Sequence, residues 1–280
     1  MEQAKLQSLK KTASEIRLGI LEEVHSASSG HPGGSLSITD ILTYLYFEEM
    51  NVDPKNPKMA DRDRLVLSKG HTAPALYATL AEKGFFDKSA LKTLRQADSF
   101  LQGHPDMKGI PGVDMTTGSL GLGFSAACGM ALAAKVDGKA YRTYAIVGDG
   151  ESQEGQIWEA AMLAAHYKLD NLCVVIDYNK LQIDGPVAEV MNPTPHDKKF
   201  EAFGFHVISI DGHDFEQIEK AFEEAKTVVG KPTAIIAHTV KGKGVSFMEN
   251  QVGWHGSAPN AEQYEIAMNE LKAQLAELEA

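Results

Sequence analysis

Two nearly continuous apolar segments joined by one helical segment constrain the fold of this chain most strongly. Residues 143–147 and 172–176 are almost entirely apolar, as in strands that are buried on both faces. Between them, residues 153–167 carry apolar side chains at helical spacing. Such a unit crosses over in the right-handed sense, so its two strands are parallel. We therefore predict an α/β fold in which helices cover both faces of a parallel sheet.

The same patterns predict the other elements. Further strands are expected at residues 64–67, 206–210 and 233–238, and helices at residues 3–25, 39–50, 74–83, 126–136 and 215–228. Residues 26–35 and 116–123 are rich in glycine and serine and are expected to form loops. The chain shows no internal repeat and no linker, so its 280 residues are expected to form a single domain.

The segment from Ala261 to the end of the sequence has the pattern of an amphipathic helix. Its apolar residues follow a heptad spacing: Tyr264, Met268, Leu271, Leu275 and Leu278. The segment is shorter than three heptads, so we expect a helix docked on its own domain rather than a coiled coil.

Charge, hydropathy and cysteine usage exclude several classes of protein. Lys and Arg number 27 and Asp and Glu 38, for a net charge of −11, which argues against a nucleic-acid partner. No run of 18 apolar residues and no N-terminal apolar core occur, so neither a membrane span nor a signal peptide is expected. Cys128 and Cys173 lie in apolar runs without CxxC spacing, which indicates inert thiols and a reducing, cytoplasmic compartment.

Polar residues follow the two central strands. Asp149 comes directly after the first strand and Asn179 after the second, and parallel strands present such residues at the same edge of the sheet. Carboxylate and amide oxygens suit Mg²⁺ or Ca²⁺. One carboxylate neutralises only part of the charge of such an ion, and a bound diphosphate would balance the rest. Gly148 and Gly150 would let the backbone approach that anion. The alternative is an ordinary turn with solvated polar residues.

At this point a family resemblance appears. Gly148-Asp149-Gly150, with Asn179 30 residues after Asp149, resembles the metal and diphosphate motif of thiamine-diphosphate enzymes. Five further segments resemble transketolases and follow that family's order: Ser-Gly-His-Pro-Gly at 29–33, Leu-Ser-Lys-Gly-His at 67–71, Gly-His-Pro at 103–105, Thr-Gly-Ser-Leu-Gly at 117–121 and Trp-His-Gly at 254–256. The resemblance extends over nearly the whole chain and implies a thiamine-diphosphate-binding fold.

The resemblance implies roles for the matched residues. The side chains of Asp149 and Asn179 and the backbone carbonyl of Leu181 would bind the metal, with Mg²⁺ expected and Ca²⁺ or Mn²⁺ as alternatives. Cofactor contacts are implied for His71, Gly118, Ser119, Leu120, Gly148, Gly150, Ile183, Lys241 and His255. Glu154 and Glu159 match acidic residues that lie at the subunit interface of the family, near the cofactor.

Four histidines are implied to be catalytic. His31, His71, His104 and His255 match family histidines around the reactive carbon of the cofactor and the sugar hydroxyls. Ketol transfer passes a two-carbon fragment through a carbanion that the cofactor holds. Protons must move to and from sugar hydroxyls, and histidine suits that task near pH 7. The remaining histidines match no motif of the family.

Transketolases carry a pyrimidine-binding domain and a C-terminal domain that this sequence does not match. The resemblance therefore implies that residues 1–280 form one N-terminal, diphosphate-binding domain. A separate chain would carry the other two domains, and an α2β2 heterotetramer is expected.

The substrate and several competing functions stay open. The first expectation is transfer from a ketose phosphate such as xylulose 5-phosphate to an aldose phosphate such as ribose 5-phosphate, in the pentose phosphate pathway. A split transketolase for a sulfo-sugar or a branched-sugar phosphate is the alternative. The α subunit of a 2-oxo acid dehydrogenase lacks the histidine loops, and 1-deoxyxylulose-phosphate synthase is usually one long chain. A non-catalytic cofactor-binding or regulatory module need not retain Asp149, Asn179 and the four histidines.

Overall fold

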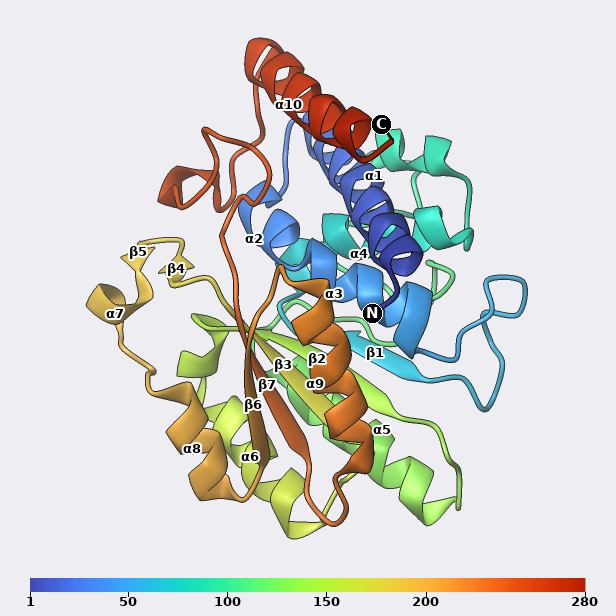
Figure 1. The fold of residues 1–280 in the computed structure, drawn as a ribbon, viewed down its shortest axis with the longest axis vertical. Helices are drawn as coiled ribbons and strands as arrows, with labels where there is room; N and C mark the ends of the chain where they lie inside the picture. The colour runs from blue at the N-terminus through green and yellow to red at the C-terminus, as the bar shows by residue number, and fades with distance from the viewer. Residues whose placement is uncertain (280) are drawn as a thin grey trace.

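A parallel five-stranded sheet forms the centre of the computed structural model, which describes residues 1–279 (Figure 1). The strand order is β1 (Arg64–Leu67), β2 (Thr143–Gly148), β3 (Leu172–Tyr178), β7 (Thr233–His238) and β6 (His206–Asp211). All neighbouring pairs are parallel. The predicted strands and their parallel arrangement are confirmed.

Side chains of the strands alternate between two apolar cores, one on each face of the sheet. In β2, Tyr144 and Ile146 belong to one core, whereas Ala145 and Val147 belong to the other. The first core includes α1 (Gln3–Ala27), α3 (Thr39–Tyr44), α4 (Ala73–Lys83) and α9 (Phe215–Thr227). The second includes α5 (Leu122–Val136), α6 (Gly155–His166) and α8 (His196–Phe203). The predicted cover of helices on both faces is therefore confirmed.

The C-terminal helix, α10 (Ala261–Glu279), packs against α1 (Figure 1). Ala267 and Leu271 are fully buried and join the first core. His25 of α1 stacks on Tyr264 with ring centroids 4.0 Å apart. These contacts confirm that the helix docks on its own domain.

Several predicted boundaries are wrong. The loop expected at residues 26–35 is short, because α2 (Pro32–Ser37) begins inside it with a proline at its first turn, where a missing N–H costs nothing. The helix expected at 39–50 ends as α3 at Tyr44 and continues as a π-turn, Leu45–Glu49. Helix α5 begins at Leu122, directly after Gly121, whose φ of 85° ends the preceding loop.

Residues 181–203 contain elements that the sequence pattern did not predict. A two-stranded hairpin, β4 (Leu181–Gln182) with β5 (Gly185–Pro186), is followed by α7 (Val187–Val190) and then by α8. Short 3-10 turns occupy Gly70–Thr72, Lys88–Thr93, Glu151–Gln153 and Val252–Trp254.

No helix within residues 1–279 combines the length and the apolar character needed to cross a bilayer.

Candidate active site

A cavity of 410 Å³ lies at the carboxyl ends of the strands. Its walls come from the segments that follow β1, β2, β3 and β7, together with loops that carry His31, Gly118 and His255. Most of the sequence-predicted site residues line it: His31, His71, Gly118, Leu120, Gly148, Asp149, Gly150, Glu154, Asn179, Leu181, Ile183, Lys241 and His255. Residues from widely separated parts of the sequence therefore meet at one sheet edge, as expected for a ligand site in this class of fold.

Three sequence-predicted residues do not line this cavity. His104 is exposed and lies beside Gly118, where a Cβ atom built on the glycine would be 3.5 Å from the His104 ring. Ser119 is exposed in the same loop as Gly118. Glu159 is exposed on α6, and it lies one turn beyond Glu154, which does line the cavity.

Asp149 is buried in the wall of the cavity and is held by the backbone of two loops, the one after β2 and the one after β3. Only 2 % of the residue is exposed, and its carboxylate accepts hydrogen bonds from the backbone N–H groups of Gly150 and Lys180. Burial, and next the nearby Asp177 carboxylate, raise the pKa of Asp149 to about 7. A cation bound here would offset the unfavourable burial of this carboxylate.

Asn179 directs its amide oxygen toward the same region. Its Nδ2 atom donates to the Asp177 carboxylate at 2.9 Å, and its Oδ1 atom accepts from the backbone N–H of Leu181 at 3.1 Å. The Leu181 carbonyl oxygen accepts from Lys241 Nζ at 3.0 Å. A carboxylate, an amide oxygen and a carbonyl oxygen are hard donors that fit Mg²⁺ or Ca²⁺.

Lys241 places an uncompensated positive charge against the cavity. The residue is 2 % exposed, and its Nζ atom also bonds to His255 Nδ1 at 3.0 Å. Among residues 1–279, no carboxylate forms an ion pair with this ammonium group. Burial, and next the Lys69 ammonium, lower the pKa of Lys241 to about 8. A buried cation without a counter-ion favours an anionic ligand such as a diphosphate.

Three histidine rings meet at the mouth of the cavity. The ring centroids of His31 and His71 are 5.1 Å apart, those of His71 and His255 5.2 Å, and those of His31 and His255 5.6 Å. Burial lowers the pKa of His31 to about 4 and that of His255 to about 3. It also lowers the pKa of His71 well below its usual value. All three imidazoles are therefore neutral at pH 7 and can both donate and accept hydrogen bonds.

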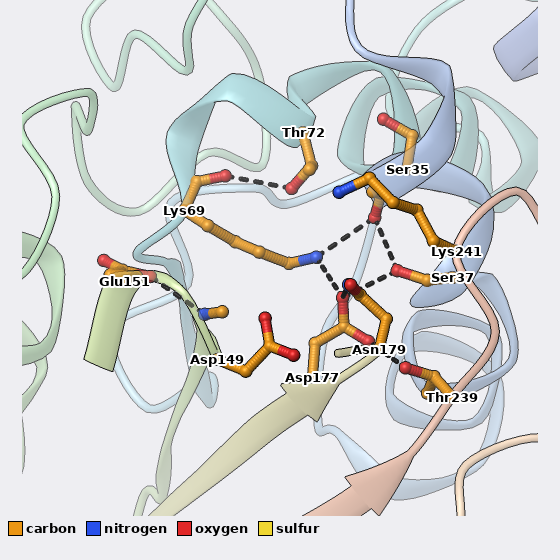
Figure 2. Close-up of polar contacts among 12 residues, drawn as sticks. Ser35, Ser37, Lys69, Thr72, Asp149, Glu151, Asp177, Asn179, Thr239 and Lys241 are labelled. Carbon is orange, nitrogen blue, oxygen red and sulfur yellow. Dashed lines mark hydrogen bonds and ion pairs between the residues drawn. The ribbon is translucent and has the colours of Figure 1, made fainter. Parts of the chain in front are cut away.

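Lys69 and Glu151 also line the cavity and belong to a network of buried polar side chains that the sequence patterns did not predict. The Asp177 carboxylate and Lys69 Nζ form an ion pair at 2.6 Å, and both residues are almost completely buried (Figure 2). Glu151 accepts hydrogen bonds from Ser68 Oγ at 2.6 Å and from the N–H of Gly121 at 2.8 Å. The one sequence feature that points to this network is Asp177, a charged residue at the end of an otherwise apolar strand.

The fold and this cavity define a class of enzyme. A parallel α/β sheet with hard oxygen donors, a buried ammonium group and neutral imidazoles at its carboxyl edge is suited to a diphosphate cofactor with a divalent ion. Residues 8–276 match the family model "Transketolase, thiamine diphosphate binding domain". The chain belongs to the transketolase family, so the predicted family and fold are confirmed. The match to a thiamine diphosphate binding domain supports the predicted organic cofactor.

Curated relatives include both single subunits and complete transketolases. The 6-deoxy-6-sulfo-D-fructose transketolase subunit SqwG of a Clostridium species is 51% identical, over 94% of this chain and 96% of that protein. An apulose-4-phosphate transketolase subunit of Phocaeicola vulgatus is 44% identical, over 98% of this chain and 97% of that subunit. Human transketolase is 43% identical over 98% of this chain, which spans 44% of the human protein.

Solved transketolases share the fold. The enzyme of Campylobacter jejuni superposes with a TM-score of 0.90 at 36% identity, covering 99% of this chain and 46% of that one. The transketolase of Pichia stipitis in complex with sedoheptulose 7-phosphate superposes with a TM-score of 0.87 at 32% identity. The match covers 98% of this chain and 44% of that one. The chain is therefore a transketolase-type transferase component that corresponds to the N-terminal part of these enzymes.

Proposed function

We propose that this chain is the diphosphate-binding subunit of a split transketolase. Residues 1–280 form its N-terminal domain, and a separate chain supplies the pyrimidine-binding and C-terminal domains in an α2β2 heterotetramer. Two relatives named as subunits match this chain over almost their full length, whereas the human protein is more than twice as long as the matched region. A cytoplasmic location stays a prediction from the two free cysteines.

We assign the cofactor site to the cavity at the strand ends. Asp149, Asn179 and the Leu181 carbonyl hold Mg²⁺, and the carbonyl can serve both the ion and Lys241 because its oxygen has two acceptor positions. The observation that carries this assignment is that these three oxygen donors and the unpaired Lys241 ammonium line one cavity. Further cofactor contacts come from His71, Gly118, Ser119, Leu120, Gly148, Gly150, Ile183 and His255, with Glu154 and Glu159 on the side of a neighbouring subunit.

Bound thiamine diphosphate supplies the electron sink for the two-carbon unit. The residues of this chain exclude water from the diphosphate, orient it and manage protons at the sugar. Because burial keeps the rings of His31, His71 and His255 neutral at pH 7, they can donate hydrogen bonds to the sugar hydroxyls and accept hydrogen bonds from them. His104, which is exposed beside Gly118, would join them where the substrate extends out of the cavity.

The sugar substrate has two candidates. Transfer from xylulose 5-phosphate to ribose 5-phosphate, in the pentose phosphate pathway, is the first, since complete transketolases are similar over this region. A sulfo-sugar or a branched-sugar phosphate is the second, weakly favoured by the 51% and 44% identity to subunits named for such sugars. Parallel assays with the partner chain and each ketose donor, at matched concentrations, separate these candidates by their kcat/KM values.

The proposed cofactor site is tested by calorimetry with thiamine diphosphate and Mg²⁺. We expect heat of binding that disappears with EDTA, and a loss of at least about 10-fold in affinity for Asp149→Ala, because Asp149 is the one charged group among the three proposed protein ligands. Circular dichroism checks that the variant folds. Unchanged metal-dependent binding by Asp149→Ala contradicts the assignment.

The split is tested by reconstitution of activity. The purified chain alone is expected to show no ketol transfer, and addition of the partner chain restores it. Turnover by the isolated chain contradicts a split enzyme. Cofactor binding without turnover in the presence of the partner would indicate the non-catalytic alternative instead.

A further inference from the structure

Asp177 is a buried carboxylate that gathers four donors from four parts of the chain. It has no exposed surface. Its Oδ2 atom accepts from Ser37 Oγ at 2.6 Å, Lys69 Nζ at 2.6 Å and Asn179 Nδ2 at 2.9 Å, and its Oδ1 atom accepts from Thr239 Oγ1. Figure 2 shows these side chains converging on Asp177 from α2 and from the ends of β1, β3 and β7.

The contact with Asn179 fixes the orientation of an amide that could otherwise rotate. An ionised carboxylate can only accept hydrogen bonds, so the nitrogen of the amide must face Asp177. The oxygen then faces the other way, where the Leu181 N–H donates to it, and one acceptor position stays open. Rotating the amide by half a turn would place oxygen against oxygen at Asp177 and lose both hydrogen bonds.

The Lys69 ion pair explains why Asp177 itself is not a ligand. Its negative charge is matched by a buried ammonium group, which also donates to the Gly34 carbonyl at 3.0 Å. With its lone pairs used by four donors, Asp177 has little capacity left for a cation. Asp149 has no such cation within salt-bridge distance among residues 1–279, and it receives only backbone N–H groups.

We propose that Asp177 is a positioning residue for the divalent ion: it holds the Asn179 amide with its oxygen facing the cavity, and so sets the affinity for the ion without touching it. This inference rests on the proposed function. Because outer partners of metal ligands typically contribute 10–100-fold to metal affinity, its loss should have a measurable effect on binding.

The test is Mn²⁺ binding to the full chain, measured by electron paramagnetic resonance at saturating thiamine diphosphate. For Asp177→Leu, which removes the acceptor that orients the Asn179 amide, we expect Mn²⁺ affinity to fall by about 10-fold or more, with cofactor stoichiometry restored at high Mn²⁺. The side-chain amide NMR signal of Asn179 should shift toward that of a free amide. A purely structural role would lower the melting temperature without this metal-dependent rescue.

Two control variants separate orientation from general loosening of the site. Glu23→Gln alters a carboxylate that is equally buried but lies in α1, and it should leave Mn²⁺ affinity unchanged. Ser37→Ala/Thr239→Val removes two donors from Asp177 but keeps the contact with Asn179, and it should change the affinity less than about 3-fold, since each neutral bond contributes modestly. If Asp177→Leu does not fold, Asp177→Leu/Lys69→Met removes both charges and is expected to show the same weakened Mn²⁺ binding.

The outcomes distinguish this inference from the proposed function. Wild-type affinity in Asp177→Leu, or equal weakening in Ser37→Ala/Thr239→Val, overturns the positioning role while the metal site stands. Absence of Mn²⁺ binding by the wild-type chain and by Glu23→Gln overturns the proposed metal site, and the positioning role with it.

Discussion

Asp177 at the sheet edge and Glu23 in helix α1 are both fully buried carboxylic acids, yet their surroundings differ completely. Asp177 receives four donors, one of them an ammonium group. Within the described part of the chain, neither carboxyl oxygen of Glu23 has a hydrogen-bond partner. The degree of burial therefore does not reveal the role of a charged residue. Its hydrogen-bond and ion-pair partners do.

The partners also set the two ionisation states. Burial alone would raise the pKa of Asp177, but the Lys69 ammonium and the donors around it hold that pKa below its usual value. Burial raises the pKa of Glu23 well above its usual value, and the Glu22 carboxylate adds to the shift. Asp177 is an ionised link between several elements, whereas the burial of Glu23 favours the protonated form of its carboxyl group.

The largest expected effect is the loss of the Asp177 carboxylate. Asp177→Leu leaves Lys69 as an unpaired buried charge, and we expect the free energy of unfolding to fall by about 3–5 kcal/mol. Urea denaturation followed by circular dichroism measures this change. The double variant Asp177→Leu/Lys69→Met should recover most of the loss, and a single-variant loss below about 1 kcal/mol would show that the pair is unimportant.

Replacing Glu23 should raise the free energy of unfolding, whereas replacing Asp177 should lower it. Glu23→Met fills a similar volume and removes two buried acceptors that lack donors, so we expect a gain of about 1–3 kcal/mol at pH 7. Thermal unfolding should show a higher melting temperature. A destabilised variant would mean that Glu23 has a partner in solution, such as a bound water, and the contrast with Asp177 would then weaken.

The smallest expected effect is the pH dependence of that gain. Below the usual pKa of 4.5, Glu23 is protonated in both the folded and the unfolded chain. As the pH rises from 4.5 to the raised pKa, the unfolded chain loses a proton that the folded chain keeps, so the stability of the wild type falls. The advantage of Glu23→Met should therefore be smaller at pH 4.5 than at pH 7. A constant advantage over this range would contradict the raised pKa.

Sequence patterns predicted the parts of the molecule that depend on local periodicity. Near-continuous apolar strands identified the sheet, and Asp149 and Asn179 could be placed together because each directly follows a strand. The ion pair of Lys69 with Asp177 joins residues 108 positions apart, and no local pattern reveals such a pair. The buried state of Glu23 likewise depends on what packs over α1, since its neighbours in the helix include the partly exposed Glu22.

Asp149, Asn179 and the Leu181 carbonyl are proposed to hold a divalent ion that anchors a diphosphate. A crystal of this chain grown with thiamine diphosphate and Mn²⁺ tests it most directly, because the anomalous signal of Mn²⁺ locates the ion. We predict one peak at about 2.0–2.3 Å from one carboxylate oxygen of Asp149, Asn179 Oδ1 and the Leu181 carbonyl oxygen. A peak elsewhere, or a diphosphate bound away from Lys241 and Gly150, would contradict the account.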